Sequence, residues 1–210
     1  MPTTSNVIDG YYGDPFDFQR LKDEGIVAII HKATQGTDFK DPKYKARRDA
    51  AKALGLLWGA FHFSTDADWE NQVDHFLDTA QPQPDELIAW DWEARKHGAP
   101  MTIGHVRDSV ELINEKLGRY PVLYGGSVLR EQVGNTNDVV LRNCPLWYAR
   151  YRSAPIGIPS NTWSTYTLWQ YTAGESPTHN PPGPVKAGGE FVDRNFYQGS
   201  DDDLRAKWPF

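Results

Sequence analysis

The chain has 210 residues, enough for one large domain or two small ones, and 39% of them are hydrophobic, enough to bury a core. Its formal net charge of −6 argues against nucleic acid as the main partner, and its charged fraction of 24% argues against disorder. The single cysteine excludes an internal disulfide and any cysteine-based metal cluster.

The first half of the chain alternates short apolar runs with helical patterns. The run at 26–30 is continuous and mostly β-branched, which is typical of a strand buried on both faces. Asp41-Pro42 predicts a helix start, with Asp41 as the N-cap and Pro42 at the first helical position. Strands are predicted at 7–9, 26–30, 56–63 and 87–93, and helices at 17–24, 41–54, 67–79 and 102–117.

The second half of the chain loses this rhythm. A fifth strand at 121–124 precedes a short helix near 127–132. Three further strands, at 146–149, 167–171 and 190–193, are joined by segments rich in Pro, Gly, Ser and Asn without a helical period.

The order of these elements predicts an α/β fold in one domain over 1–210, with its core at about 7–199. Alternating β and α units indicate a parallel sheet, and about eight strands favour a closed or nearly closed barrel. An open Rossmann-like sheet is the alternative. The absence of Gly-x-Gly-x-x-Gly after the first strand disfavours it.

Polar side chains stand at the end of almost every predicted strand, where parallel barrels place their active sites. In Leu87-Ile88-Ala89-Trp90-Asp91-Trp92-Glu93, strand alternation puts Asp91 and Glu93 on one side and Trp92 on the other. Two close carboxyls raise the pKa of one of them, which suits acid/base chemistry; a solvated acidic strand end is the alternative. The other strand ends carry Asp9, His31, Lys32, His62, Tyr124, Tyr148, Arg150, Gln170 and Asp193.

Aromatic residues near these acids favour a sugar as the substrate, because pyranose rings pack on indole and phenol rings while their hydroxyls bind acids and amides. Ordinary core packing is the alternative for each aromatic residue. No metal or cofactor is expected, since the six histidines form neither His-Glu-x-x-His nor a short His-x-His pair. The candidates for the aromatic platform are Tyr11, Tyr12, Tyr124, Trp147, Tyr148, Tyr151 and Trp169.

From about Val7 to Gly199, the chain resembles glycoside hydrolase family 25, the muramidases of the Chalaropsis-type lysozyme group. Single matching segments would be weak, but eight occur in the same order. They are Val7-Ile8-Asp9-Gly10, Ile30-His31-Lys32-Ala33-Thr34-Gln35-Gly36, Asp41-Pro42, Gly59-Ala60-Phe61-His62-Phe63, Asp91-Trp92-Glu93, Leu146-Trp147-Tyr148-Ala149 with Tyr151, Trp169-Gln170-Tyr171, and Val192-Asp193-Arg194-Asn195.

The resemblance implies an irregular, TIM-like β/α barrel with about five βα units followed by strands that lack helices. It also implies cleavage of the β-1,4 bond from N-acetylmuramic acid to N-acetylglucosamine in peptidoglycan. By position, Glu93 is the general acid/base, Asp91 is a nucleophile or steers the substrate's acetamido oxygen, and Asp9 and Asp193 flank them. We expect retention of configuration, and sugar binding by Tyr11, Lys32, His62, Tyr124, Tyr148, Trp169 and Gln170.

Two residues depart from the family pattern, because Gln35 stands where Glu is frequent and Phe61 where Tyr is frequent. Two other functions are alternatives: a barrel that binds peptidoglycan or chitin-type sugars without catalysis, and a family 18 chitinase-like enzyme. The retained acids disfavour the first. The second is disfavoured because the segment before Asp91 lacks the further aspartates of that family.

Residues 1–6 contain no basic segment and no long apolar segment, and no apolar run reaches the roughly 18 residues that span a bilayer. We therefore expect no signal peptide in this chain, synthesis in the cytoplasm, and action on the cell wall after lysis or non-classical export. We also expect a monomer that binds glycan strands and neither binds nucleic acid nor inserts into a membrane.

Overall fold

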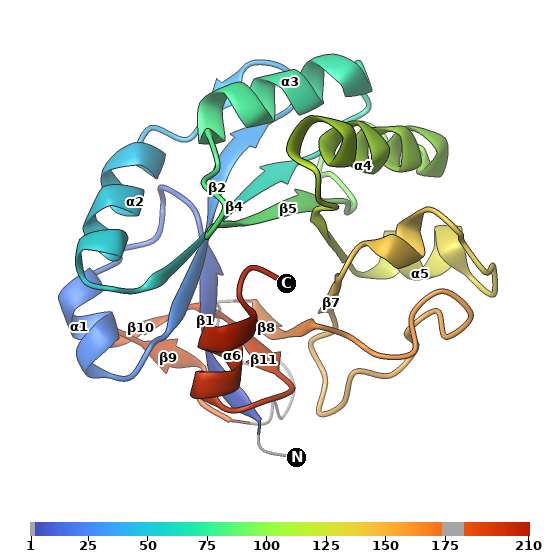
Figure 1. The fold of residues 1–210 in the computed structure, drawn as a ribbon. Helices are drawn as coiled ribbons and strands as arrows, with labels where there is room; N and C mark the ends of the chain where they lie inside the picture. The colour runs from blue at the N-terminus through green and yellow to red at the C-terminus, as the bar shows by residue number, and fades with distance from the viewer. Residues whose placement is uncertain (1–2, 174–182) are drawn as a thin grey trace.

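The computed structural model describes residues 3–173 and 183–210, and eight strands of its main sheet close into a barrel with helices around it (Figure 1). Seven neighbouring strands are parallel, whereas β11 runs antiparallel to both β8 and β1 and closes the barrel between them. The short strand β3 (Phe39–Lys40) pairs with the outer end of β2. The barrel strands are β1 (Thr4–Gly10), β2 (Ala28–Gln35), β4 (Leu57–Phe63), β5 (Leu87–Asp91), β6 (Val122–Gly125), β7 (Leu146–Ala149), β8 (Leu168–Ala173) and β11 (Asp193–Tyr197).

Five helices each follow one of the first five barrel strands and lie around the outside of the barrel (Figure 1). Residues 150–167, all of which are described, join β7 to β8 without a helix. The predicted barrel of about five βα units followed by a helix-free connection is therefore confirmed. The five helices are α1 (Phe18–Asp23), α2 (Tyr44–Ala53), α3 (Trp69–Ala80), α4 (Ile103–Leu117) and α5 (Ser127–Val133).

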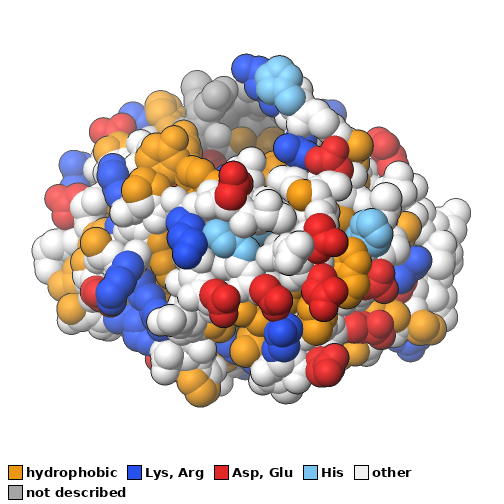
Figure 2. Space-filling model, turned by 90° about the horizontal axis from the view of Figure 1, so that it is seen from above, with side chains coloured by type: hydrophobic (Ala, Val, Ile, Leu, Met, Phe, Trp, Pro, Cys, Tyr) orange, Lys and Arg blue, Asp and Glu red, His pale blue; other side chains and the backbone are white. Residues whose placement is uncertain are grey.

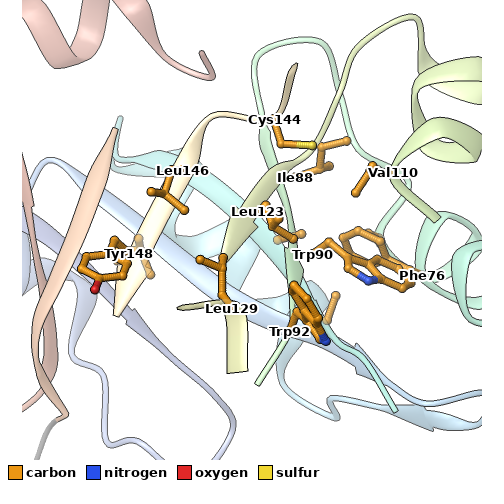
Figure 3. Close-up of a cluster of buried hydrophobic side chains, with 14 of the residues drawn as sticks. Phe76, Ile88, Trp90, Trp92, Val110, Leu123, Leu129, Cys144, Leu146 and Tyr148 are labelled. Atoms are coloured by element: carbon orange, nitrogen blue, oxygen red, sulfur yellow. The ribbon is translucent and has the colours of Figure 1, made fainter. Parts of the chain in front are cut away.

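Strand alternation divides the core into two layers. Inside the barrel, residues such as Leu87 and Ala89 of β5 belong to one buried cluster. Their neighbours Ile88 and Trp90 belong to a second cluster, which lies between the barrel and its helices. Figure 3 shows part of this outer layer, where side chains of the strands meet those of α3 and α4.

A sixth helix, α6 (Asp201–Lys207), covers the end of the barrel at which the parallel strands begin (Figure 1). We call this the far end of the barrel. Leu204 and Trp208 pack into the inner cluster, and the Trp208 indole Nε1 donates to the Trp58 carbonyl over 3.1 Å. Because Trp58 lies near the start of β4, this contact is at the end of the barrel opposite the strand carboxyl ends. The sequence prediction lacked this helix, although Ser200 and Asp203 form a capping box at its start.

Two predicted elements begin elsewhere. The helix expected from Asp41 starts at Tyr44, because the Asp41 carboxylate instead accepts bonds from the backbone N–H groups of Tyr12 and Lys43. The strand expected at 190–193 is two elements: β10 (Glu190–Phe191) forms a hairpin with β9 (Lys186–Ala187), and the barrel strand β11 begins only at Asp193.

Charged side chains of both signs are mixed with hydrophobic and uncharged ones on the face of the molecule that Figure 2 shows. Within the described ranges, no helix is long and apolar enough to cross a membrane.

Candidate active site

A cavity of about 280 Å³ opens where the parallel strands end. All four predicted acids line it, together with four of the predicted sugar-binding residues. Four further aromatic side chains and one glycine complete the wall. The lining consists of Asp9, Gly10, Tyr11, Lys32, Phe61, Phe63, Asp91, Glu93, Tyr124, Trp147, Tyr151, Gln170 and Asp193.

Asp91 and Glu93 both line the cavity although β5 ends at Asp91. The chain stays extended beyond the strand, since the Trp92 N–H donates to the Tyr124 carbonyl over 3.0 Å. Trp92 points the other way and is fully buried, with its indole Nε1 donating to the Met101 carbonyl over 2.8 Å. The anchored indole between the two acids therefore fixes them on one side, as the sequence predicts.

The Asp91 carboxyl is buried, and its Oδ1 has no hydrogen-bond partner among the described residues. Burial and the Glu93 charge raise the pKa of Asp91 well above its ordinary value. Burial also raises the pKa of Glu93. Lys32 opposes both shifts. Asp91 and Glu93 thus both keep their protons to higher pH than free carboxyl groups do. Asp91 also offers an acceptor oxygen that no donor among the described residues satisfies.

Asp9 is held by two amide side chains. Gln170 Nε2 donates to both oxygens of Asp9 over 3.0 and 2.9 Å, and Asn195 Nδ2 donates to Oδ1 over 2.8 Å. Burial raises the pKa of Asp9 to about 7, although these two donors favour its ionised form.

Three aromatic side chains fix the orientation of those amides. The hydroxyls of Tyr124 and Tyr151 donate to Gln170 Oε1 over 2.7 and 2.9 Å, and Trp147 Nε1 donates to Asn195 Oδ1 over 2.6 Å. Since the amide oxygens accept these bonds, the amide nitrogens must face Asp9. Lining aromatics therefore position Asp9 as well as shaping the wall.

Asp193 reaches the same cavity by a route that the sequence prediction missed. We expected it at the carboxyl end of a parallel strand, but it is the first residue of the antiparallel β11. The start of an antiparallel strand lies at the same edge as the ends of its parallel neighbours. Burial and the charge of Asp9 raise the pKa of Asp193 to about 9.

Three of the predicted sugar-binding residues do not line the cavity. His62 is buried behind β4, where it bonds to Thr34 Oγ1 and Gln72 and stacks on Trp90 with ring centroids 4.5 Å apart. Burial lowers its pKa to about 3. Its role is to support the strand that carries Asp91.

Tyr148 and Trp169 also face the outer layer. Tyr148 lies in the cluster of Figure 3, and its hydroxyl donates to the Ile156 carbonyl over 2.8 Å. Trp169 stacks on Phe196 at 5.4 Å and donates from Nε1 to the Arg150 carbonyl. Each stands one position away from a residue that does line the cavity, namely Trp147 and Gln170.

The sequence prediction lacked Phe61, Phe63 and Asn195 as site residues, and it named Trp147 and Tyr151 only as candidates for the aromatic platform. Strand alternation is the signal that could have found them, since Phe61 and Phe63 flank His62 and Trp147 precedes Tyr148. In the part of the chain that the structure describes, no group of three or more His, Cys, Asp or Glu side chains is arranged to hold a metal ion.

Comparison with known proteins gives consistent matches. The sequence profile of Glycosyl hydrolases family 25 matches residues 8–178. An N,O-diacetylmuramidase of Arthroderma benhamiae is 26% identical over 175 residues, covering 78% of this chain and 74% of that relative.

Two solved structures share the fold. A muramidase from Acremonium alcalophilum superposes with a TM-score of 0.79 at 28% identity, covering 95% of this chain and 96% of that one. A bacterial lysozyme from Streptomyces coelicolor superposes with a TM-score of 0.80 at 26% identity, covering 95% and 94% of the two chains.

Proposed function

The chain belongs to glycosyl hydrolases family 25 and is a muramidase that hydrolyses peptidoglycan, and we propose that Glu93 donates the proton that cleaves the β-1,4 bond after N-acetylmuramic acid. The observation that carries this assignment is the cavity at the strand ends, which gathers four carboxyl side chains beneath aromatic walls. Carboxyl pairs are the usual acid/base equipment of glycosidases.

Glu93 is suited to the role of acid. It is half-buried at the cavity wall, and burial raises its pKa, so it keeps a proton closer to neutral pH than a free glutamate does. Its carboxyl accepts and donates no hydrogen bond within the described part of the chain, so the proton is available to a substrate oxygen. That proton passes to the glycosidic oxygen as the bond to C1 of the muramic acid breaks.

Asp91 is suited to a different role. Its unpartnered buried oxygen is an acceptor that a substrate N–H can satisfy, and the 2-acetamido group next to C1 offers such a donor. We propose that this bond turns the acetamido carbonyl oxygen toward C1, where it attacks from the face opposite the leaving group. Water then opens the resulting cyclic intermediate, with Glu93 as the base.

Two displacements at C1 return the original configuration, so this route predicts retention.

Asp9 and Asp193 form the opposite wall of the cavity. Asp9 is held rigidly by its amide donors, which suits it to bind substrate hydroxyls.

Digestion of purified peptidoglycan with mass analysis of the products tests the function directly. We expect new reducing ends on N-acetylmuramic acid. For Glu93→Gln we expect a loss of about 100- to 10,000-fold in turnover, the range typical of a general acid. The exposed Glu111 on α4 offers a matched control, and Glu111→Gln is expected to retain wild-type turnover.

Wild-type rates in Glu93→Gln would remove Glu93 from the mechanism. Binding of glycan by the wild-type chain without any new reducing ends would instead favour a sugar-binding barrel that lacks catalysis.

A further inference from the structure

A second cavity, of about 310 Å³, adjoins the catalytic one. Glu93 and Tyr151 line both, so the two cavities share a wall at the proposed proton donor. Its other lining residues are small or cationic. They are Gly126, Ser127, Ala149, Arg130, Arg150 and Arg152.

The three arginines give this cavity a positive wall, and Glu93 at the shared wall is the one acid among its described lining residues. Among the described residues, no carboxylate forms an ion pair with Arg130, Arg150 or Arg152. The Nε of Arg150 is buried and has no hydrogen-bond partner there. A buried guanidinium N–H without an acceptor costs free energy. An acceptor atom of a ligand could provide the missing hydrogen bond.

Backbone contacts hold two of these arginines in place. The Arg150 N–H donates to the Gln170 carbonyl over 3.0 Å, and the Arg152 N–H donates to the Arg150 carbonyl over 2.9 Å. Arg130 rises from α5, with its guanidinium 5.9 Å above the Tyr148 ring. The hydroxyl of Tyr148 donates to the Ile156 carbonyl, so the ring beneath Arg130 is itself held in place.

The floor of the second cavity is made of small residues. At Gly126, a side chain would bring its first carbon to 3.3 Å from the Ala149 carbonyl oxygen. The absence of that carbon, together with the short side chains of Ser127 and Ala149, leaves room for a chain-like group between the arginines.

The ligand must be an anionic substituent of the sugar that Glu93 acts on. Muramic acid, unlike N-acetylglucosamine, carries a lactyl group at O3 that is extended by a short peptide with free carboxylates. Guanidinium groups bind carboxylates through paired N–H donors. We propose that the arginine cavity is a subsite for the carboxylates of this stem peptide.

This inference rests on the proposed muramidase function and refines its substrate to glycan that bears peptides. Binding energy gained at a remote substituent can be used to place the reacting bond against the catalytic groups. The enzyme therefore cleaves peptide-bearing glycan with free carboxylates faster than glycan without peptide or with amidated peptide.

Three matched substrates test the subsite: glycan strands with free-acid stem peptides, the same strands with those carboxylates amidated, and strands stripped of peptide. For Arg152→Gln and Arg150→Gln we expect kcat/KM on the free-acid substrate to fall about tenfold, as for the loss of one charge-assisted bond. On the stripped strands both variants should match the wild type.

Arg152 is exposed, so its replacement leaves the fold intact even where Arg150→Gln lowers stability. Arg152→Lys keeps the charge and is expected to recover part of the loss. Arg205→Gln, on α6 at the far end of the barrel, removes an equal charge and should change none of the three rates.

Equal losses on all three substrates, or no loss on any, would overturn the subsite. Failure of the wild type to release reducing ends from every substrate would instead overturn the proposed function.

Discussion

Asp9 and Asp193 are direct partners across the antiparallel strands β1 and β11, so two carboxyl groups face each other where the barrel closes. Burial is the largest cause of the raised pKa of each, and their mutual charge raises the pKa of Asp193 further. At neutral pH this pair keeps protons that the unfolded chain releases, which links the site to stability.

Replacing Asp193 by Asn should stabilise the protein at neutral and higher pH. The pKa of Asp193 rises from 3.8 to about 9 on folding, so between these values the folded state binds more protons than the unfolded state. The free energy of unfolding then falls as the pH rises through this window. At pH 8 we expect Asp193→Asn to gain about 1–2 kcal/mol while losing activity, a trade-off typical of functional sites.

Urea denaturation at several pH values between 4 and 9 measures this difference. The gain should grow with pH, and the exposed Asp108→Asn should show no such growth. A gain that stays constant with pH would contradict the linkage.

Lys32→Met should move the alkaline limb of the pH–activity profile upward. Lys32 lowers the pKa values of Asp91 and Glu93, and its ammonium lies 4.8 Å above the Phe63 ring at the cavity wall. Without that charge the ionised carboxylates are less stable, so Glu93 keeps its proton to higher pH. We expect the alkaline limb of the kcat/KM profile to shift to higher pH by about one unit.

The methionine keeps the apolar stem of the lysine, so packing changes little. Lys40→Met, on the exposed edge strand β3, is the matched control and should leave the profile in place. An unmoved limb in Lys32→Met would show that Lys32 does not set the protonation of the acids.

Gln170→Leu should destabilise the fold and inactivate the enzyme together. The change removes both hydrogen bonds from Gln170 to Asp9 and the acceptor of the Tyr124 and Tyr151 hydroxyls. We expect a loss of about 2 kcal/mol in the free energy of unfolding, from the buried polar groups left unbonded. Chemical denaturation measures it, with the exposed Gln132→Leu on α5 as control. Wild-type stability in Gln170→Leu would mean that the amide is not structurally required.

The acetamido route makes a prediction about the substrate. NMR of the first products should show the β-anomer of the new reducing sugar, because two displacements restore the configuration. Strands whose muramic acid lacks the N-acetyl group should be cleaved at least about 100-fold more slowly, since the internal nucleophile is missing. Comparable rates on both strands would indicate instead that Asp91 itself attacks C1.

The sequence predicts the acids better than it predicts the aromatic wall. Asp91 and Glu93 are two residues apart, so they share a side whichever side that is, and the anchored Trp92 keeps the chain extended. His62, Tyr148 and Trp169 were assigned to the cavity from position alone, and each faces the outer layer. Barrel strands are buried on both faces, so an apolar run does not reveal which of two adjacent residues points inward.

Strand direction was the other limit. The sequence pattern predicted a last strand at 190–193 in a closed or nearly closed barrel, but it carried no information on the direction of that strand. Asp193 reaches the cavity because β11 is antiparallel, and the same reversal places Asn195 beneath Asp9. Long-range pairing of this kind depends on how the barrel closes rather than on the residues of the strand.

Closure by β11 also has a consequence for synthesis. The strand that carries Asp9 is the first barrel strand to leave the ribosome, and the one that supplies Asp193 and Asn195 is the last. Until residues 193–197 emerge, Asp9 lacks one of its two amide donors and the barrel has an open seam. Pairing between such distant segments is a late step for a growing chain. The nascent protein therefore carries no complete catalytic site while most of it is still being made.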